Sequence, residues 1–109
     1  MTIQDFITKT GFAPTILADE EREISGVYIG DLLSWVMGRA KVDDAWITIM
    51  SNINVIAVAS LADVGCVVFA EGVVPDSELT RVACEKGVNL LSTPLSSYEA
   101  AVKISEVLR

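Results

Sequence analysis

The sequence predicts an α/β fold, in which residues 1–109 form one layered domain and helices flank a mostly parallel central sheet. Two observations lead to this prediction. Strand-like and helix-like segments alternate along the chain, and three strand–helix units follow one another in its second half. No linker, repeat or low-complexity stretch interrupts them. Units of this kind build layered sheets with parallel pairing.

The first half of the chain has a helix at its start. The predicted elements here are a helix over 2–11, strands over 14–18 and 24–30, and a short helix over 32–40. Thr2 with Asp5 three residues later resembles a capping box. Gly11 is typical of a residue that ends a helix. Asp31 is predicted to cap the short helix.

The second half is more regular. The predicted elements are strands over 45–50, 66–70 and 88–92 and helices over 53–63, 76–87 and 96–109. The strand at 45–50 has alternating side chains, whereas 66–70 is continuously apolar, which is typical of a strand that is covered on both faces. Gly87 is expected to end the helix before it.

The composition predicts a subunit interface. Hydrophobic residues make up 51% of the chain and charged residues only 21%, which is more apolar surface than one small core needs. We therefore expect a homodimer. Asp63 and Gly65 break the longest apolar run into pieces that are too short to cross a bilayer, so no membrane is expected as a partner. No signal peptide is evident, and the expected location is cytoplasmic.

Charge and residue types exclude several functions. Eight basic residues against fifteen acidic ones give a net charge of −7, which disfavours nucleic acid as a partner. The absence of histidine removes Ser-His and Cys-His nucleophile pairs and most zinc sites. We expect no metal and no cofactor. Cys66 and Cys84 lack CxxC spacing, and we expect both to be buried, unreactive thiols.

Two glycines near the first strands raise the question of a phosphate loop. Gly26 and Gly30 have the wrong spacing for a GxGxxG fingerprint, and the chain contains no Gly-Lys-Ser or Gly-Lys-Thr. Gly30 with Asp31 is better explained as a turn followed by a helix cap. The sequence therefore does not predict a kinase.

Three stretches of the chain resemble a known family. They are REISGVYIGDLLSWVMGRAKVDDAWIT, NINVIAVASLADVGCVVFAEGVVPD and GVNLLSTPLSSYEAA. In this order, over residues 15–105, they are similar to the DRTGG domain family. Glu21, Arg22 and Gly26 are what remains of the five letters that name the family. The resemblance implies a fold similar to the N-terminal domain of HPr kinase/phosphorylase and a regulatory or sensory module that tends to dimerise, without kinase activity.

Polar residues gather where the three later strands end. Ligands of open α/β sheets bind beyond the carboxyl ends of parallel strands, and helix N-termini there favour anionic groups. The candidate ligand-binding residues are Ser51, Asn52, Asn54, Glu71, Gly72, Thr93 and Ser96. We expect Ser51, Asn52, Glu71, Thr93 and Ser96 to line one shallow cleft. Helix capping alone is the competing explanation for most of them, and Glu71 is the least easily explained by it.

The short helix carries a second candidate surface. Trp35, Val36 and Met37 either pack in the core or form a dimer seam. A catalytic residue is not predicted, because an acid–base pair would need Glu71 to meet Asp31 or Asp76, and no spacing argument brings them together.

Three functions are compatible with these features. The first is a non-enzymatic, dimeric regulatory module that binds a small anionic metabolite or nucleotide, or docks to a partner protein. The second is a small enzyme that acts on such a ligand, and the third is a purely structural interaction domain.

Overall fold

Five strands form one sheet in the order β1-β5-β4-β3-β2. The computed structural model describes residues 1–108. The strands are β1 (Ala13–Ile16), β2 (Gly26–Ile29), β3 (Asp44–Thr48), β4 (Cys66–Phe69) and β5 (Leu90–Ser92). Strand β1 runs antiparallel to β5, and the other neighbours are parallel. The predicted α/β class with a mostly parallel sheet is therefore confirmed.

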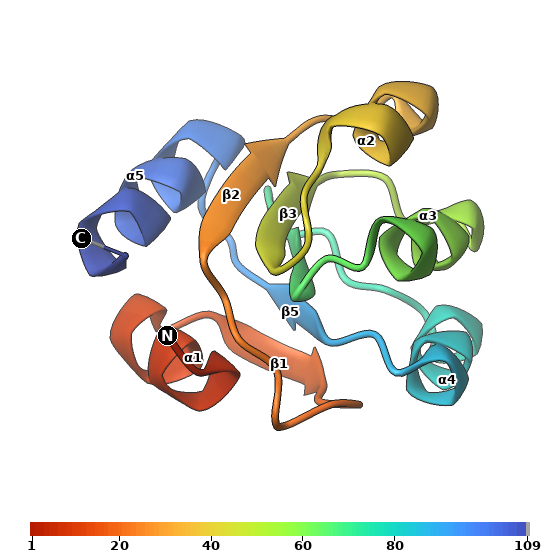
Figure 1. The fold of residues 1–109 in the computed structure, drawn as a ribbon, viewed down its shortest axis with the longest axis horizontal. Helices are drawn as coiled ribbons and strands as arrows, with labels where there is room; N and C mark the ends of the chain where they lie inside the picture. The colour runs from red at the N-terminus through yellow and green to blue at the C-terminus, as the bar shows by residue number, and fades with distance from the viewer. Residues whose placement is uncertain (109) are drawn as a thin grey trace.

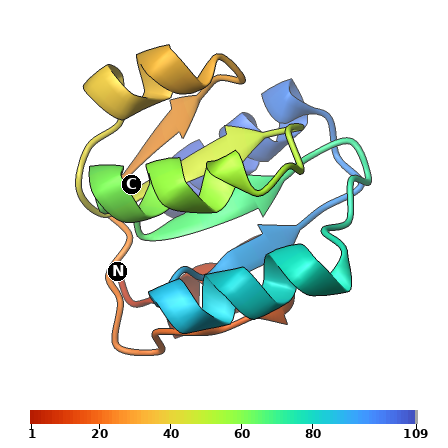
Figure 2. The same cartoon turned by 90° about the vertical axis from the view of Figure 1, so that its right-hand side faces the viewer.

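Helices cover both faces of this sheet. They are α1 (Ile3–Thr10), α2 (Leu33–Arg39), α3 (Asn54–Ala62), α4 (Ser77–Lys86) and α5 (Ser97–Val107). Helices α2, α3 and α4 lie on one face, and α1 and α5 lie on the other (Figures 1 and 2). The chain changes face after β5, because α5 leaves on the side opposite to α4. Arg109, the last residue of the predicted final helix, lies outside the described residues.

The hydrophobic core has one layer on each side of the sheet. Trp46 and Phe69 are fully buried beneath the three-helix face, and Phe6 and Ile47 beneath the other. All five residues of β3 are buried. Helices cover this strand on both faces, so its alternating side chains pack into the two layers of the core.

Three of the predicted helix boundaries are made by the expected residues. The Thr2 hydroxyl accepts a hydrogen bond from the Asp5 N–H at 3.1 Å. Gly11 has φ 76° and Gly87 has φ 73°, so both end their helices in the left-handed conformation that glycine adopts without strain.

The predicted role of Asp31 is wrong. Helix α2 begins after Leu32 and has no side-chain cap. Instead, Oδ1 of Asp31 accepts hydrogen bonds from the Thr48 hydroxyl at 2.7 Å and from the Ile49 N–H at 2.9 Å. The carboxylate therefore joins the end of β2 to the end of β3.

Arg22 joins three loops at the opposite edge of the sheet. Its Nε donates to Oδ1 of Asp43 at 3.1 Å, and its Nη1 donates to Oδ1 of Asp63 at 2.7 Å. Nη2 also donates to the Asp63 carbonyl. Burial lowers the pKa of Arg22, but hydrogen bonds and charge from Asp63 and Asp43 outweigh it and raise the pKa above its ordinary value. The guanidinium therefore stays charged.

The two thiols differ in exposure. Cys66 is buried, and its burial raises the pKa of the thiol, as expected for an unreactive cysteine. Cys84 is exposed, so the expectation that it is buried is wrong. It lies on the outer side of the amphipathic helix α4, whose buried residues are Leu79 and Ala83. None of the described helices has the length and apolar character to cross a membrane.

Candidate functional site at the carboxyl edge of the sheet

The loops after β3, β4 and β5 leave the sheet from the same edge. These three strands are parallel neighbours, so their carboxyl ends lie side by side. Helices α3 and α4 then pack on one face, and α5 packs on the other (Figure 1). The point where the helices change face lies between β4 and β5, which is where open α/β sheets usually have their ligand crevice.

In this protein, backbone hydrogen bonds close that crevice. The Glu71 N–H donates to the Leu95 carbonyl at 2.8 Å, and the Gly72 N–H donates to the Thr93 carbonyl at 3.0 Å. Both Glu71 and Gly72 are left-handed, with φ 59° and 75°. The tight turn after β4 is thus tied to the loop after β5, and these N–H groups are not free to bind a ligand.

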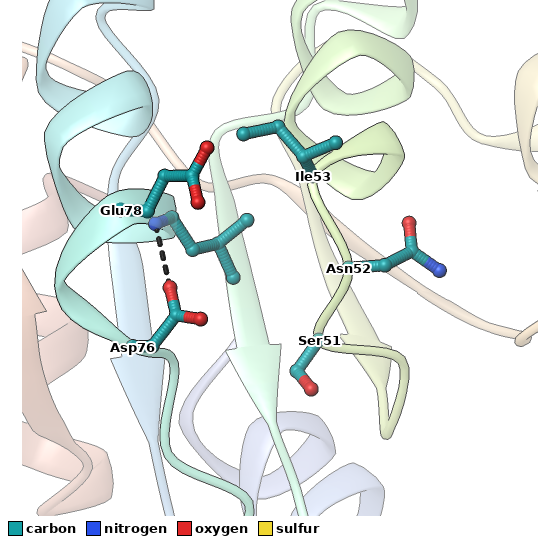
Figure 3. A pocket seen from close by; sticks show the side chains of 6 residues that line it. Ser51, Asn52, Ile53, Asp76 and Glu78 are labelled. Atoms are coloured by element: carbon teal, nitrogen blue, oxygen red, sulfur yellow. Dashed lines mark hydrogen bonds between the residues drawn. The ribbon is translucent and has the colours of Figure 1, made fainter.

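An open hollow lies one strand further along, between the starts of α3 and α4 (Figure 3). We call it the α3–α4 hollow. Its volume is about 230 Å³. Its lining residues are Ser51, Asn52, Ile53, Asp76, Glu78 and Leu79. The Ser51 side chain points toward the α4 side, whereas the Asn52 side chain points away from it (Figure 3).

The two helix ends give this hollow a mixed electrostatic character. At α3, the Asn52 side chain accepts a hydrogen bond from the Asn54 N–H at 2.9 Å, and the first turn contains no acidic residue. The dipole of α3 therefore favours an anionic group there. At α4, Oδ1 of Asp76 accepts a hydrogen bond from the Leu79 N–H at 2.8 Å, and Glu78 adds an exposed carboxylate. The α4 side therefore favours hydroxyl or amino donors.

Four of the seven predicted binding residues are divided between two hollows. Ser51 and Asn52 line the α3–α4 hollow, while Gly72 and Thr93 line a smaller, mostly apolar one of about 160 Å³ next to β1. The single cleft that we expected is therefore not formed. Glu71 is exposed beside these loops. The cleft is divided because α5 leaves on the other face of the sheet. In addition, the hydrogen bonds of Glu71 and Gly72 tie the loop after β4 to the loop after β5.

Several predicted site residues make local hydrogen bonds. Oδ1 of Asn52 accepts from the Asn54 N–H at 2.9 Å, and the Thr93 hydroxyl accepts from the Leu95 N–H at 3.2 Å. Ser96 forms a full capping box with Glu99 at the start of α5. These local hydrogen bonds give Ser96, Asn52 and Thr93 the kind of structural role that was the alternative to ligand binding.

The candidate binding residues did not include four residues that line the α3–α4 hollow, which are Ile53, Asp76, Glu78 and Leu79. Glu78 and Leu79 belong to the first turn of α4, whereas none of our candidates lay on that helix. The signal for them was present, because a helix that follows Asp76 on a parallel strand must begin beside the loop of the neighbouring strand.

The candidate dimer residues on α2 differ in exposure. Val36 has no exposed surface and lies in the core, so it is not available to a partner. Trp35 and Met37 are 53% and 42% exposed. The candidate surface on this helix is thereby reduced to two side chains.

The family model of the DRTGG domain matches residues 13–107. The chain belongs to the DRTGG domain family. The match covers every element of this DRTGG domain except α1, including the α3–α4 hollow. No curated protein sequence matches the chain.

One solved structure similar to this DRTGG domain is that of the CBS and DRTGG domains of the regulatory region of Clostridium perfringens pyrophosphatase, complexed with the activator diadenosine tetraphosphate. The TM-score is 0.73 and the sequence identity 13%, over 94% of this chain and 45% of that chain. The DRTGG domain thus spans less than half the length of this neighbour. At this identity the likeness shows the fold.

Proposed function

We propose that this DRTGG domain is a non-enzymatic regulatory module that binds a nucleotide or similar phosphorylated metabolite at the α3–α4 hollow. The observation that carries the proposal is the pairing of the α3 N-terminus, whose first turn has no acidic residue, with the exposed Glu78 carboxylate on the other side of the hollow. A nucleotide has the complementary groups, since its phosphate suits the α3 end and its ribose hydroxyls suit the carboxylate.

Three further observations bear on this proposal. The similar pyrophosphatase region is regulatory and is complexed with a dinucleotide. The volume of about 230 Å³ is below the roughly 300–1,000 Å³ of ligand pockets, so the hollow would hold one end of such a ligand. Asp31 and Asp76 are held by backbone N–H groups, which argues against their pairing with Glu71 in catalysis. We also expect the module to act as a dimer inside the cell.

Isothermal titration calorimetry of the full chain tests the ligand proposal. We expect saturable binding of AMP, ATP or diadenosine tetraphosphate, and at least tenfold weaker binding of adenosine, which lacks the phosphate. Ser51→Asp adds a negative charge in the hollow and should weaken nucleotide binding at least tenfold. Gln4→Glu adds the same charge to α1 on the other face and should have no effect. Absence of binding by all three nucleotides at millimolar concentration would contradict the proposal.

A further inference from the structure

The outer edge of β2 presents unpaired backbone groups. Strand β2 is the last strand of the sheet and pairs only with β3 among the described residues. The Gly30 N–H donates to the Ile47 carbonyl at 3.2 Å, so Gly30 points toward β3. Successive strand residues alternate, and Tyr28 therefore also points toward β3. The N–H and C=O groups of Val27 and Ile29 are then directed outward, away from the sheet.

The two edges of the sheet are protected to different degrees. At the opposite edge, β1 contains Pro14, and its pairing with β5 is irregular between Pro14 and Ile16. Proline and bulges are the devices with which proteins prevent further strand pairing. The segment 26–30 contains neither proline nor a charged residue. The β2 edge therefore remains able to accept another strand.

Apolar side chains surround this open edge. Val27, Ile29 and Val42 are 39%, 48% and 57% exposed. Val27 and Val42 line a hollow of about 480 Å³ together with Arg39, whose guanidinium lies 3.9 Å from the Trp35 ring centre. The exposed indole of Trp35 thus lies next to Arg39, which is one of the lining residues of this hollow. We call Val27, Ile29, Trp35, Arg39 and Val42 the β2-edge surface.

The area of this surface is in the range that a dimer needs. With the neighbouring Leu32, which is 58% exposed, its apolar side chains expose on the order of 500 Å², against the roughly 800 Å² that each partner of a standard interface buries. Backbone pairing and the surrounding polar atoms would supply the remainder.

The charges at the two ends of β2 complement each other. Arg39 and Lys41 are exposed at its amino end, where the buried Asp44 is already held by the Lys41 N–H. Asp31 is exposed at its carboxyl end. If two copies pair antiparallel about a twofold axis, the amino end of each β2 meets the carboxyl end of the other. Asp31 of each copy then lies near the two basic residues of its partner.

We propose that the β2-edge surface binds a second copy of this chain by antiparallel pairing of β2 with β2, which extends the sheet across the dimer. The backbone groups of Val27 and Ile29 form the new hydrogen bonds, and the Trp35 side of α2 packs next to its counterpart. This dimer does not depend on the ligand site at the carboxyl edge. A failure of either proposal therefore leaves the other standing.

Sedimentation equilibrium and amide hydrogen exchange test this proposal on the full chain. We expect a dimer at tens of micromolar, with the Val27 and Ile29 amides exchanging more slowly as the concentration rises. The Gly30 amide is already bonded within the subunit and should be insensitive to concentration. Val27→Lys should raise the dimer dissociation constant at least tenfold, because it places charge on the paired edge.

Two further variants distinguish edge pairing from other effects. Val27→Pro removes an outward N–H that the subunit itself does not use, so circular dichroism should show a folded protein that no longer dimerises. Val74→Lys makes the same valine-to-lysine change at a 71% exposed position at the far edge, and the dimer should persist. The proposal is overturned if the wild type is monomeric at 100 μM, or if Val74→Lys disrupts the dimer equally. It is also overturned if the dimer persists in Val27→Pro, or if the Val27 and Ile29 amides of the wild type exchange equally fast at all concentrations.

Discussion

The Asp31 carboxylate and the Thr48 hydroxyl form a 2.7 Å hydrogen bond between the ends of two parallel strands. Thr48 is 1% exposed, so its hydroxyl would be costly to leave without a partner. The same carboxylate oxygen also accepts the Ile49 N–H. Asp31 therefore fixes the direction in which the chain leaves β3 toward the α3–α4 hollow.

We expect Asp31→Ala to lower the free energy of unfolding by about 1–3 kcal/mol, because it leaves the buried Thr48 hydroxyl and the Ile49 N–H without their acceptor. Asp31→Asn retains a side-chain oxygen at this position and should cost less than about 1 kcal/mol. Urea unfolding at one protein concentration measures both. Equal losses in the two variants would show that the charge, and not the acceptor, matters.

Arg22 gives a second stability prediction. We expect Arg22→Ala to cost about 1–3 kcal/mol, because it breaks several charge-assisted hydrogen bonds that join three loops. Arg81→Ala is the matched control, since Arg81 forms only an exposed pair with Glu85 on one helix. Its loss should be below about 0.5 kcal/mol. Similar urea midpoints for the two variants would argue against a structural role of Arg22.

The order and type of the elements could be predicted from the sequence because each element has a local signal. Hydrophobic periodicity marked the helices, and Gly11 and Gly87 marked two of their ends. Long-range contacts had no such signal. Asp31 precedes a helix, as a cap does, yet it bonds to residues 17 and 18 positions later. The pairing partner of β1 and the closed crevice at Glu71 also depend on tertiary packing.

The sequence predicted at which edge of the sheet the candidate site lies, but not which residues line one cavity there. Parallel strand–helix units place their loops together, which brought Ser51 near Asp76. The sequence could not show that backbone bonds would separate Thr93 from Ser51. The sequence also could not show which residues of the short helix are exposed, because Trp35 and Val36 are both apolar and only packing distinguishes them.

Glu71 occupies a backbone conformation that suits glycine better. Its φ of 59° is left-handed, and its side chain is exposed. We expect Glu71→Gly to raise the free energy of unfolding by about 0.5–1 kcal/mol, because glycine adopts this conformation without a Cβ penalty. Glu85→Gly, the same change within α4, should lower it by about 1 kcal/mol. Thermal unfolding measures both, and a destabilised Glu71→Gly variant would reveal a favourable contact of the glutamate side chain.

The buried Cys66 thiol predicts a loss of stability at alkaline pH. Burial raises its pKa above the ordinary value, and the charge of Arg22 opposes this only in part. The folded state therefore holds the proton more tightly than the unfolded state. This contribution to stability is complete below the ordinary thiol pKa of about 8.5 and decreases as the pH rises above it, by up to about 1.4 kcal/mol per pH unit.

Removal of either thiol isolates this effect from the titration of lysine and tyrosine. We expect the difference in unfolding free energy between wild type and Cys66→Ala to shrink by about 1.6 kcal/mol from pH 8.5 to pH 10, since the variant has no buried thiol to ionise. Cys84→Ala removes an exposed thiol and should follow the wild type at every pH. Urea unfolding under reducing conditions provides the measurement. If the wild-type and Cys66→Ala curves stay parallel to pH 10, ionisation of Cys66 does not limit alkaline stability.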